Sequence, residues 1–156
     1  MAVPENHHVA NLPDHVGHDF GTSEPIVLDQ PLINQFAQCT GDRQWIHVDV
    51  ERARNEGPFG GTIAHGLLTL SLIPAVHYEL GVYPADASNL VNYGFDKVRY
   101  LAPVPAGSAI VTQVEITGVE SKGPGRFLVR TKNTAFTAGA TAQPVLVAEM
   151  LAMVAA

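Results

Sequence analysis

Residues 66–80 read GLLTLSLIPAVHYEL, a stretch that is apolar on almost every side. Within residues 67–76, only Thr69 and Ser71 are polar. A helix that is hydrophobic all round is buried all round, so this stretch predicts a central helix enclosed by the rest of the chain. Pro74 should kink this helix, because its ring clashes with the carbonyl group four residues back, at Leu70.

The C-terminal half has the pattern of β-strands. Its segments are rich in β-branched residues that partly alternate with polar ones. The predicted strands are residues 92–101, 109–119, 126–137 and 144–154. Short turn signals, APVPAGS and SKGPG, separate the first three, which favours antiparallel pairing. A buried helix and such a sheet predict an α+β fold, with the antiparallel sheet wrapped around the long central helix.

Helix signals precede the central stretch. Asp29 has the character of an N-cap, and Gly41 is a plausible C-terminal stop, so a helix is predicted between them. Cys39 falls inside this helix, where it is expected to pack. A second short helix is predicted over residues 50–55, and the glycine-rich residues 57–66 predict an irregular loop.

Length and composition indicate one folded domain over residues 1–156, with residues 1–20 as an N-terminal segment that could lie extended. The 46% of hydrophobic and 15% of charged residues exclude extensive disorder. A net charge of −6 disfavours nucleic-acid binding. The apolar runs are too short for a membrane span, and the N-terminus has no secretory signal. A lone cysteine cannot form an internal disulfide, and together these features predict a cytoplasmic protein.

The segment from Phe36 to Ala53, FAQCTGDRQWIHVDVERA, carries the strongest candidate for chemistry. Asp42 and His47 are five residues apart, which on an ideal helix separates them by about 140°. They converge only if the segment leaves helical geometry, as a helix stop at Gly41 would allow. A carboxylate beside an imidazole can handle protons. The alternative is structural, with Asp42 satisfying loop amides and His47 packing beside its apolar neighbours.

The same segment resembles the hydratase 2 motif of the MaoC-like dehydratase family, which includes (R)-specific enoyl-CoA hydratases. The residues that match that motif are Phe36, Gly41, Asp42, Ile46, His47 and Ala53. The later stretch GTIAHGLLTLSL, residues 61–72, resembles the His-Gly entry of this family into its central helix. Gln44 and Trp45 replace the Asn-Pro of many members, which is similar to a small single-domain, NodN-like subgroup. Pro74 stands where some members carry a serine.

The resemblance implies a hot-dog fold, a homodimer and a thioester substrate carried by CoA or an acyl carrier protein. It implies reversible hydration of a trans-2-enoyl-CoA to the (R)-3-hydroxyacyl-CoA, a lyase reaction of fatty acid metabolism. Asp42 and His47 would activate the water, and which of the two is the base stays open. The backbone N–H of Gly66 would stabilise the negative charge on the thioester oxygen. Neither a metal nor a redox cofactor is implied, and no nucleic-acid or membrane partner is expected.

Other residues are weaker candidates. Gln44, Trp45 and His65 could line the site, although Trp45 and His65 could equally be packing residues. A group of histidines near the N-terminus has no fixed ligand spacing, so a draped N-terminal segment is favoured over a metal site. These residues are His7, His8, His15 and His18.

Two alternative functions remain open on the same fold. One is a non-catalytic acyl-CoA-binding or NodN-like signalling module, although the presence of both Asp42 and His47 favours the enzyme. The other is an acyl-CoA thioesterase, which usually carries its carboxylate on the central helix. Residues 66–78 contain no Asp or Glu, and this counts against hydrolysis.

Overall fold

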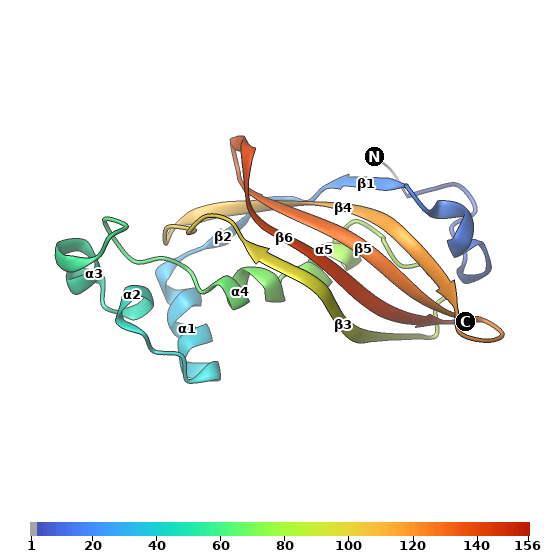
Figure 1. Cartoon of the computed structure of the whole chain (residues 1–156), viewed down its shortest axis with the longest axis horizontal. Helices are drawn as coiled ribbons and strands as arrows, with labels where there is room; N and C mark the ends of the chain where they lie inside the picture. The colour runs from blue at the N-terminus through green and yellow to red at the C-terminus, as the bar shows by residue number, and fades with distance from the viewer. Residues whose placement is uncertain (1–2) are drawn as a thin grey trace.

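The computed structural model describes residues 3–156, and for residues 140–142 it describes the backbone alone. Within these residues, six strands form one antiparallel sheet in the order β1-β4-β5-β6-β3, with β2 paired to β4 (Figure 1). The strands are β1 (Asp19–Thr22), β2 (Ile26–Leu28), β3 (Asn89–Tyr100), β4 (Ser108–Ser121), β5 (Arg126–Thr137) and β6 (Ala140–Ala155). The helices are η1 (Val9–His15), α1 (Gln30–Thr40), α2 (Trp45–Val48), α3 (Val50–Glu56), α4 (Gly66–Ser71) and α5 (Ile73–Glu79).

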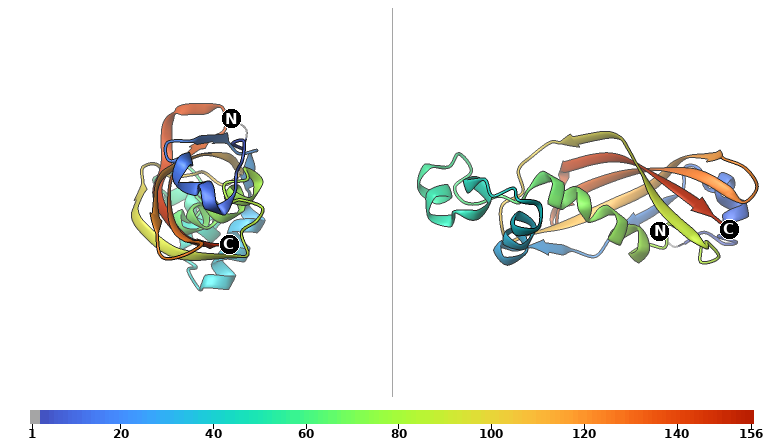
Figure 2. Two further views of the ribbon diagram at one scale, coloured as in Figure 1. Left: turned by 90° about the vertical axis from the view of Figure 1, so that its right-hand side faces the viewer. Right: turned by 90° about the horizontal axis from the view of Figure 1, so that it is seen from below.

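The sheet curves around α4 and α5, as the end-on view in Figure 2 shows. This is the hot-dog arrangement, so the predicted α+β class and the wrapped antiparallel sheet are confirmed. The four long strands lie where the sequence patterns predict them. The two short strands, β1 and β2, were not predicted, because three or four residues give no readable alternation.

The central helix is divided in two at Leu72, and Pro74 lies in the first turn of α5, where its missing N–H is not needed. The predicted distortion is therefore confirmed as a break. Burial on all sides is wrong for the single chain. One face, with Leu68 and Val76, packs under the sheet, but Leu67 is 59% exposed and Tyr78 is 66% exposed.

A buried polar group fixes α5 against the sheet. The His77 ring is fully buried, and its Nε2 lies 2.7 Å from Oδ1 of Asn133 on β5. Because that oxygen can only accept, Nε2 donates and Nδ1 accepts from the Tyr83 hydroxyl at 2.9 Å. Burial lowers the pKa of His77 to about 4, so the ring is neutral at physiological pH.

The N-terminal segment is packed onto the body of the protein. Val9 and Leu12 in η1 are buried, and the ring of His7 bonds the Val82 carbonyl at 3.1 Å. His7 and His15 lie with ring centroids 5.1 Å apart, and neither lines the pocket described below. Figure 1 shows the N-terminal segment at the opposite end of the molecule from α2 and α3. Burial is also the main reason that the pKa of His7 is lowered. No helix among the described residues is long and apolar enough to cross a membrane.

Helices α1, α2 and α3, which precede the central helix in the chain, form a group at one end of the elongated molecule (Figures 1 and 2). The Asp29 carboxylate caps α1 by accepting the N–H of Leu32 at 2.9 Å, as predicted. Gly41 ends the helix in the left-handed conformation, with φ of 83°. Cys39 does not pack: it lies on the exposed face of α1, so that expectation is wrong.

Candidate active site

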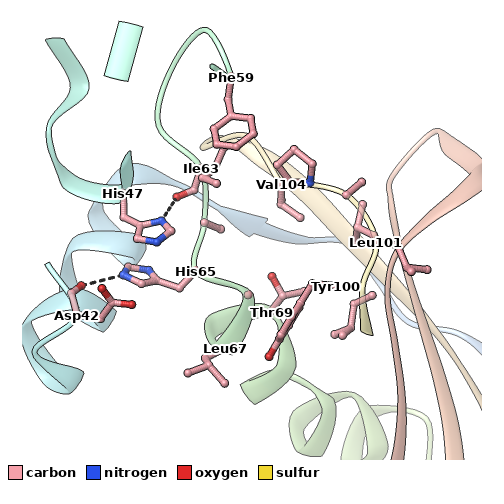
Figure 3. Close-up of a pocket in the computed structure, with 16 residues that line it drawn as sticks. Asp42, His47, Phe59, Ile63, His65, Leu67, Thr69, Tyr100, Leu101 and Val104 are labelled. Atoms are coloured by element: carbon pink, nitrogen blue, oxygen red, sulfur yellow. Dashed lines mark hydrogen bonds between the residues drawn. The ribbon is translucent and has the colours of Figure 1, made fainter. Parts of the chain in front are cut away.

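A cavity of about 450 Å³ opens beside the N-terminal end of α4. Its polar end is formed by Asp42, His47 and His65, and its apolar walls come from segments far apart in sequence (Figure 3). These walls are Phe59 together with residues 63–64, 66–67, 100–104 and 145–146. The volume falls within the range of small-molecule sites, and a mostly apolar cavity with a few polar groups at one end suits an acyl chain with a reactive head.

Asp42 reaches the cavity because the chain leaves helical geometry directly after Gly41. Residues 41–44 are irregular, and α2 begins only at Trp45. One carboxylate oxygen of Asp42 accepts the backbone N–H of Gln44 at 3.3 Å, which holds the side chain within its own loop. The turn that brings Asp42 and His47 together therefore lies at the glycine stop that the sequence predicts.

The orientation of the buried His47 ring is set by a backbone carbonyl. Its Nδ1 lies 2.7 Å from the carbonyl oxygen of Ile63, which can only accept. Nδ1 therefore carries the proton, and in the neutral ring Nε2 is a hydrogen-bond acceptor with a free lone pair. This arrangement prepares His47 to take a proton from a group bound in the cavity.

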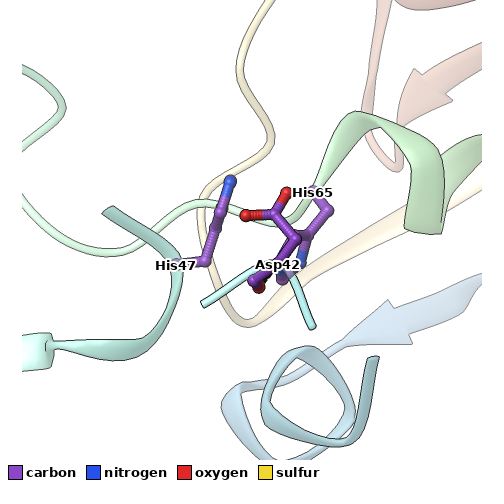
Figure 4. A group of neighbouring side chains, drawn as sticks. All are labelled: Asp42, His47 and His65. Atoms are coloured by element: carbon purple, nitrogen blue, oxygen red, sulfur yellow. Dashed lines mark hydrogen bonds between the residues drawn. The ribbon is translucent and has the colours of Figure 1, made fainter. Parts of the chain in front are cut away.

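His65 contacts both Asp42 and His47. Its Nε2 lies 3.0 Å from the backbone oxygen of Asp42 and donates to it, and its ring stacks on that of His47. Nδ1 of His65 is buried and has no hydrogen-bond partner. Figure 4 shows the three side chains gathered in one place, although they come from two loops and a helix. His65 is thus brought to the site with Asp42 and His47.

Asp42, His47 and His65 also form the group of residues here that could hold a metal ion, since one ligand atom of each lies within 4.8 Å of the others. The two rings, however, are stacked with an angle of 24° between their planes. Lone pairs lie in the ring planes, so nearly parallel rings cannot both aim at one ion between them. The arrangement suits proton transfer to a bound molecule better than tetrahedral metal coordination.

Gly66 begins α4, and the ring of Tyr100 lies directly over it. A Cβ atom at Gly66 would lie 2.8 Å from Cδ1 and Cε1 of Tyr100, which is closer than real contacts allow. The first amides of a helix have no carbonyl acceptor within that helix, so the Gly66 N–H is available at the cavity wall. Partial burial raises the pKa of the Tyr100 hydroxyl, which stays protonated at the rim.

The other candidate residues lie outside the cavity. Gln44 is exposed, and Trp45 is covered by the guanidinium of Arg52, 4.4 Å from the ring centroid; neither residue lines the cavity. Sequence reasoning did not single out Phe59 or Tyr100. Folding brings both residues to the cavity from distant parts of the chain. The only signal in the sequence was that each is an aromatic residue next to a turn-forming segment.

This chain belongs to the MaoC-like domain family, whose sequence profile matches residues 11–138. It is 42% identical to 3-hydroxyacyl-thioester dehydratase Z of Mycobacterium tuberculosis over 144 residues, which cover 92% of this chain and 93% of that protein. It is 42% identical to nodulation protein N of Rhizobium leguminosarum over 115 residues, which cover 74% of this chain and 71% of that protein. The structure of R-hydratase PhaJ1 from Pseudomonas aeruginosa aligns with a TM-score of 0.71 at 25% identity. The alignment covers 90% of this chain and 81% of that one. The predicted family is confirmed.

Proposed function

We propose that this protein catalyses the reversible hydration of trans-2-enoyl-CoA thioesters to (R)-3-hydroxyacyl-CoA thioesters. The observation that carries the proposal is the hydrogen bond from Nδ1 of His47 to the Ile63 carbonyl, which leaves Nε2 as an acceptor beside the Asp42 carboxylate. Relatives named as a dehydratase and an R-hydratase support the reaction class. The apolar walls of the cavity support an acyl substrate.

The two acceptors suit the water molecule that the reaction needs. A water that donates one hydrogen to the carboxylate and one to Nε2 is held with a lone pair free to attack C3. As one proton leaves the water, C2 must gain one, and the pair can deliver it because a carboxylate and an imidazole can each take up and release a proton. Asp42 and His47 act as one coupled unit in this proposal, so neither is assigned alone as the base.

Negative charge develops on the thioester oxygen while water adds to C3. A donor fixed in advance at that position lowers the barrier. We assign this role to the backbone N–H of Gly66, on the cavity wall. Addition of water changes no oxidation state overall, so the proposed reaction needs no redox centre.

The test follows the loss of enoyl-thioester absorbance with a short trans-2-enoyl-CoA. Wild-type protein should remove the absorbance, whereas Asp42→Asn and His47→Gln should each abolish turnover and keep the fold. Asp49→Asn is the matched control, because this carboxylate caps α3 and does not line the cavity. Wild-type protein without activity on short, medium and long enoyl-CoA or enoyl carrier-protein substrates would contradict the proposal. So would near-normal rates in either site variant.

We further propose that the protein works as a cytoplasmic homodimer. Among the described strands, β3 ends the sheet order and pairs only with β6, so its outer edge can pair with a second chain. Val91 and Tyr93 on this strand are 52% and 64% exposed, and Leu67 and Tyr78 expose apolar surface on the helices. The exposed thiol of Cys39 suits a reducing compartment. Light scattering should give the mass of two chains, and the double variant Val91→Lys/Tyr93→Lys should give that of one.

A binding or signalling module without turnover is the second candidate, supported by the identity to nodulation protein N. It predicts that acyl-CoA binds but is not hydrated. The same absorbance assay, followed by an affinity measurement with a saturated acyl-CoA, separates the two candidates.

A further inference from the structure

The hydroxyl of Thr69 has no partner within the protein. Thr69 lies on α4 and is 5% exposed, and its Oγ1 is buried without any hydrogen bond. A threonine in a helix ordinarily bonds the carbonyl four residues back, which here belongs to His65, but this bond is not made. An unpaired buried hydroxyl destabilises the fold and therefore calls for an explanation.

The hydroxyl borders the candidate active site. Thr69 lines the cavity, and Figure 3 shows its side chain pointing into it. It lies one helical turn after His65, so the two side chains share one face of the chain at the start of α4. His65 in turn stacks on His47. Thr69 therefore lines the same cavity as Asp42, His47 and His65, on the wall that α4 contributes.

Hydrogen-bond donors are scarce in this cavity. The Asp42 carboxylate accepts only, and in the neutral form of each ring the N–H groups of His47 and His65 bond backbone carbonyls. Among the side chains that line the cavity, this leaves the hydroxyls of Thr69 and Tyr100 as donors. Tyr100 is 48% exposed at the rim, so Thr69 is the buried one.

We propose that Thr69 is a further catalytic residue, whose hydroxyl donates a hydrogen bond to the thioester oxygen of the substrate. The inference rests on the proposed hydration. When the water oxygen bonds to C3, the electron pair of the C2–C3 double bond moves toward C1, and the carbonyl pair moves onto the oxygen. Return of these electrons lets C2 take its proton, and the carbonyl re-forms. A hydroxyl on this oxygen stabilises the transient charge together with the Gly66 amide.

The test compares Thr69→Val with Thr69→Ser. Valine keeps the shape and removes the hydroxyl, so kcat for a short trans-2-enoyl-CoA should fall on the order of 100-fold, while KM changes little. Serine keeps the hydroxyl and should retain most of kcat. The valine variant should unfold at the same temperature as wild type or at a higher one, because the unpaired hydroxyl is gone. Ser71→Ala is the matched control, since that hydroxyl on the same helix already bonds the Leu68 carbonyl at 2.7 Å.

Two outcomes would overturn the inference while wild-type protein is active. The first is a valine variant with normal kcat; if its stability is also lowered, the hydroxyl bonds within the protein. The second is a serine variant as slow as the valine variant. If wild-type protein hydrates no enoyl thioester, the proposed function fails, and this inference fails with it.

Discussion

The imidazole rings of His47 and His65 stack with their centroids 3.8 Å apart and their planes 24° apart. His65 also donates a hydrogen bond to the backbone oxygen of Asp42 at 3.0 Å. His65 thus contacts the ring of His47 and holds the loop that carries Asp42, the two members of the proposed catalytic pair. Its position directly before α4 ties that loop to the central helix.

Replacement of His65 by leucine should misplace the catalytic pair. Without the bond to its backbone, the Asp42 loop is free to move, and small displacements of reacting groups reduce rates strongly. We expect kcat to fall between about 10- and 100-fold, with a smaller change in KM. Steady-state kinetics beside thermal unfolding would measure this, with His8→Leu as an exposed histidine control. Equal kcat in wild type and His65→Leu would show that the stacked ring does not position the pair.

The buried hydrogen bonds of His77 should contribute to stability and leave chemistry unaffected. His77→Leu leaves Oδ1 of Asn133 and the Tyr83 hydroxyl without their ring partner. Each such group destabilises a fold by about 1–3 kcal/mol, so the unfolding midpoint in urea should drop clearly. In the double variant His77→Leu/Asn133→Leu, the loss should be smaller than the sum of the two single losses, because the bond between these two side chains is broken in each single variant. Strict additivity of the two single losses would argue against a direct bond.

The lowered pKa of His77 predicts a stability loss in mild acid. In the folded protein the pKa is about 4, whereas an unfolded chain titrates near 6.5. Between these values the unfolded state binds the proton and the folded state does not, so stability is full above pH 6.5 and falls down to pH 4. By pH 5 the loss from this group is about 2 kcal/mol. Urea unfolding at pH 7.5 and pH 5 would measure it, and His77→Leu should lose less between the two pH values than wild type does.

Local signals in the sequence were enough to predict much of this fold. Asp29 and Gly41 mark the ends of α1 by their own capping geometry, and the long strands show their alternation within a few residues. The convergence of Asp42 and His47 followed from the same glycine stop. Each of these features depends on neighbours in the chain, which is why pattern and propensity predict it.

Features that depend on distant contacts were beyond those signals. An all-apolar helix does not tell which face the sheet leaves open, so the exposure of Leu67 and Tyr78 was missed. Tyr100 reaches the cavity only because β3 ends against α4. Cys39 was assigned to the packed face of α1, yet the buried positions of that helix are Ile33 and Ala37.

The contact between Gly66 and Tyr100 makes a last prediction that separates packing from catalysis. Gly66→Ala places a Cβ atom 2.8 Å from the Tyr100 ring, so the ring must move or the fold must give way. The single variant should be destabilised by about 1–3 kcal/mol, as overpacked sites are. With Tyr100→Ala in addition, the clash is gone, and alanine in a helix should be neutral or better than glycine. A double-mutant cycle on unfolding free energies would give this coupling.

The amide of residue 66 is present in both backgrounds, so the Gly66→Ala/Tyr100→Ala protein should recover activity lost through the clash alone. If stability recovers and activity does not, the glycine or the tyrosine ring is needed at the site for more than packing.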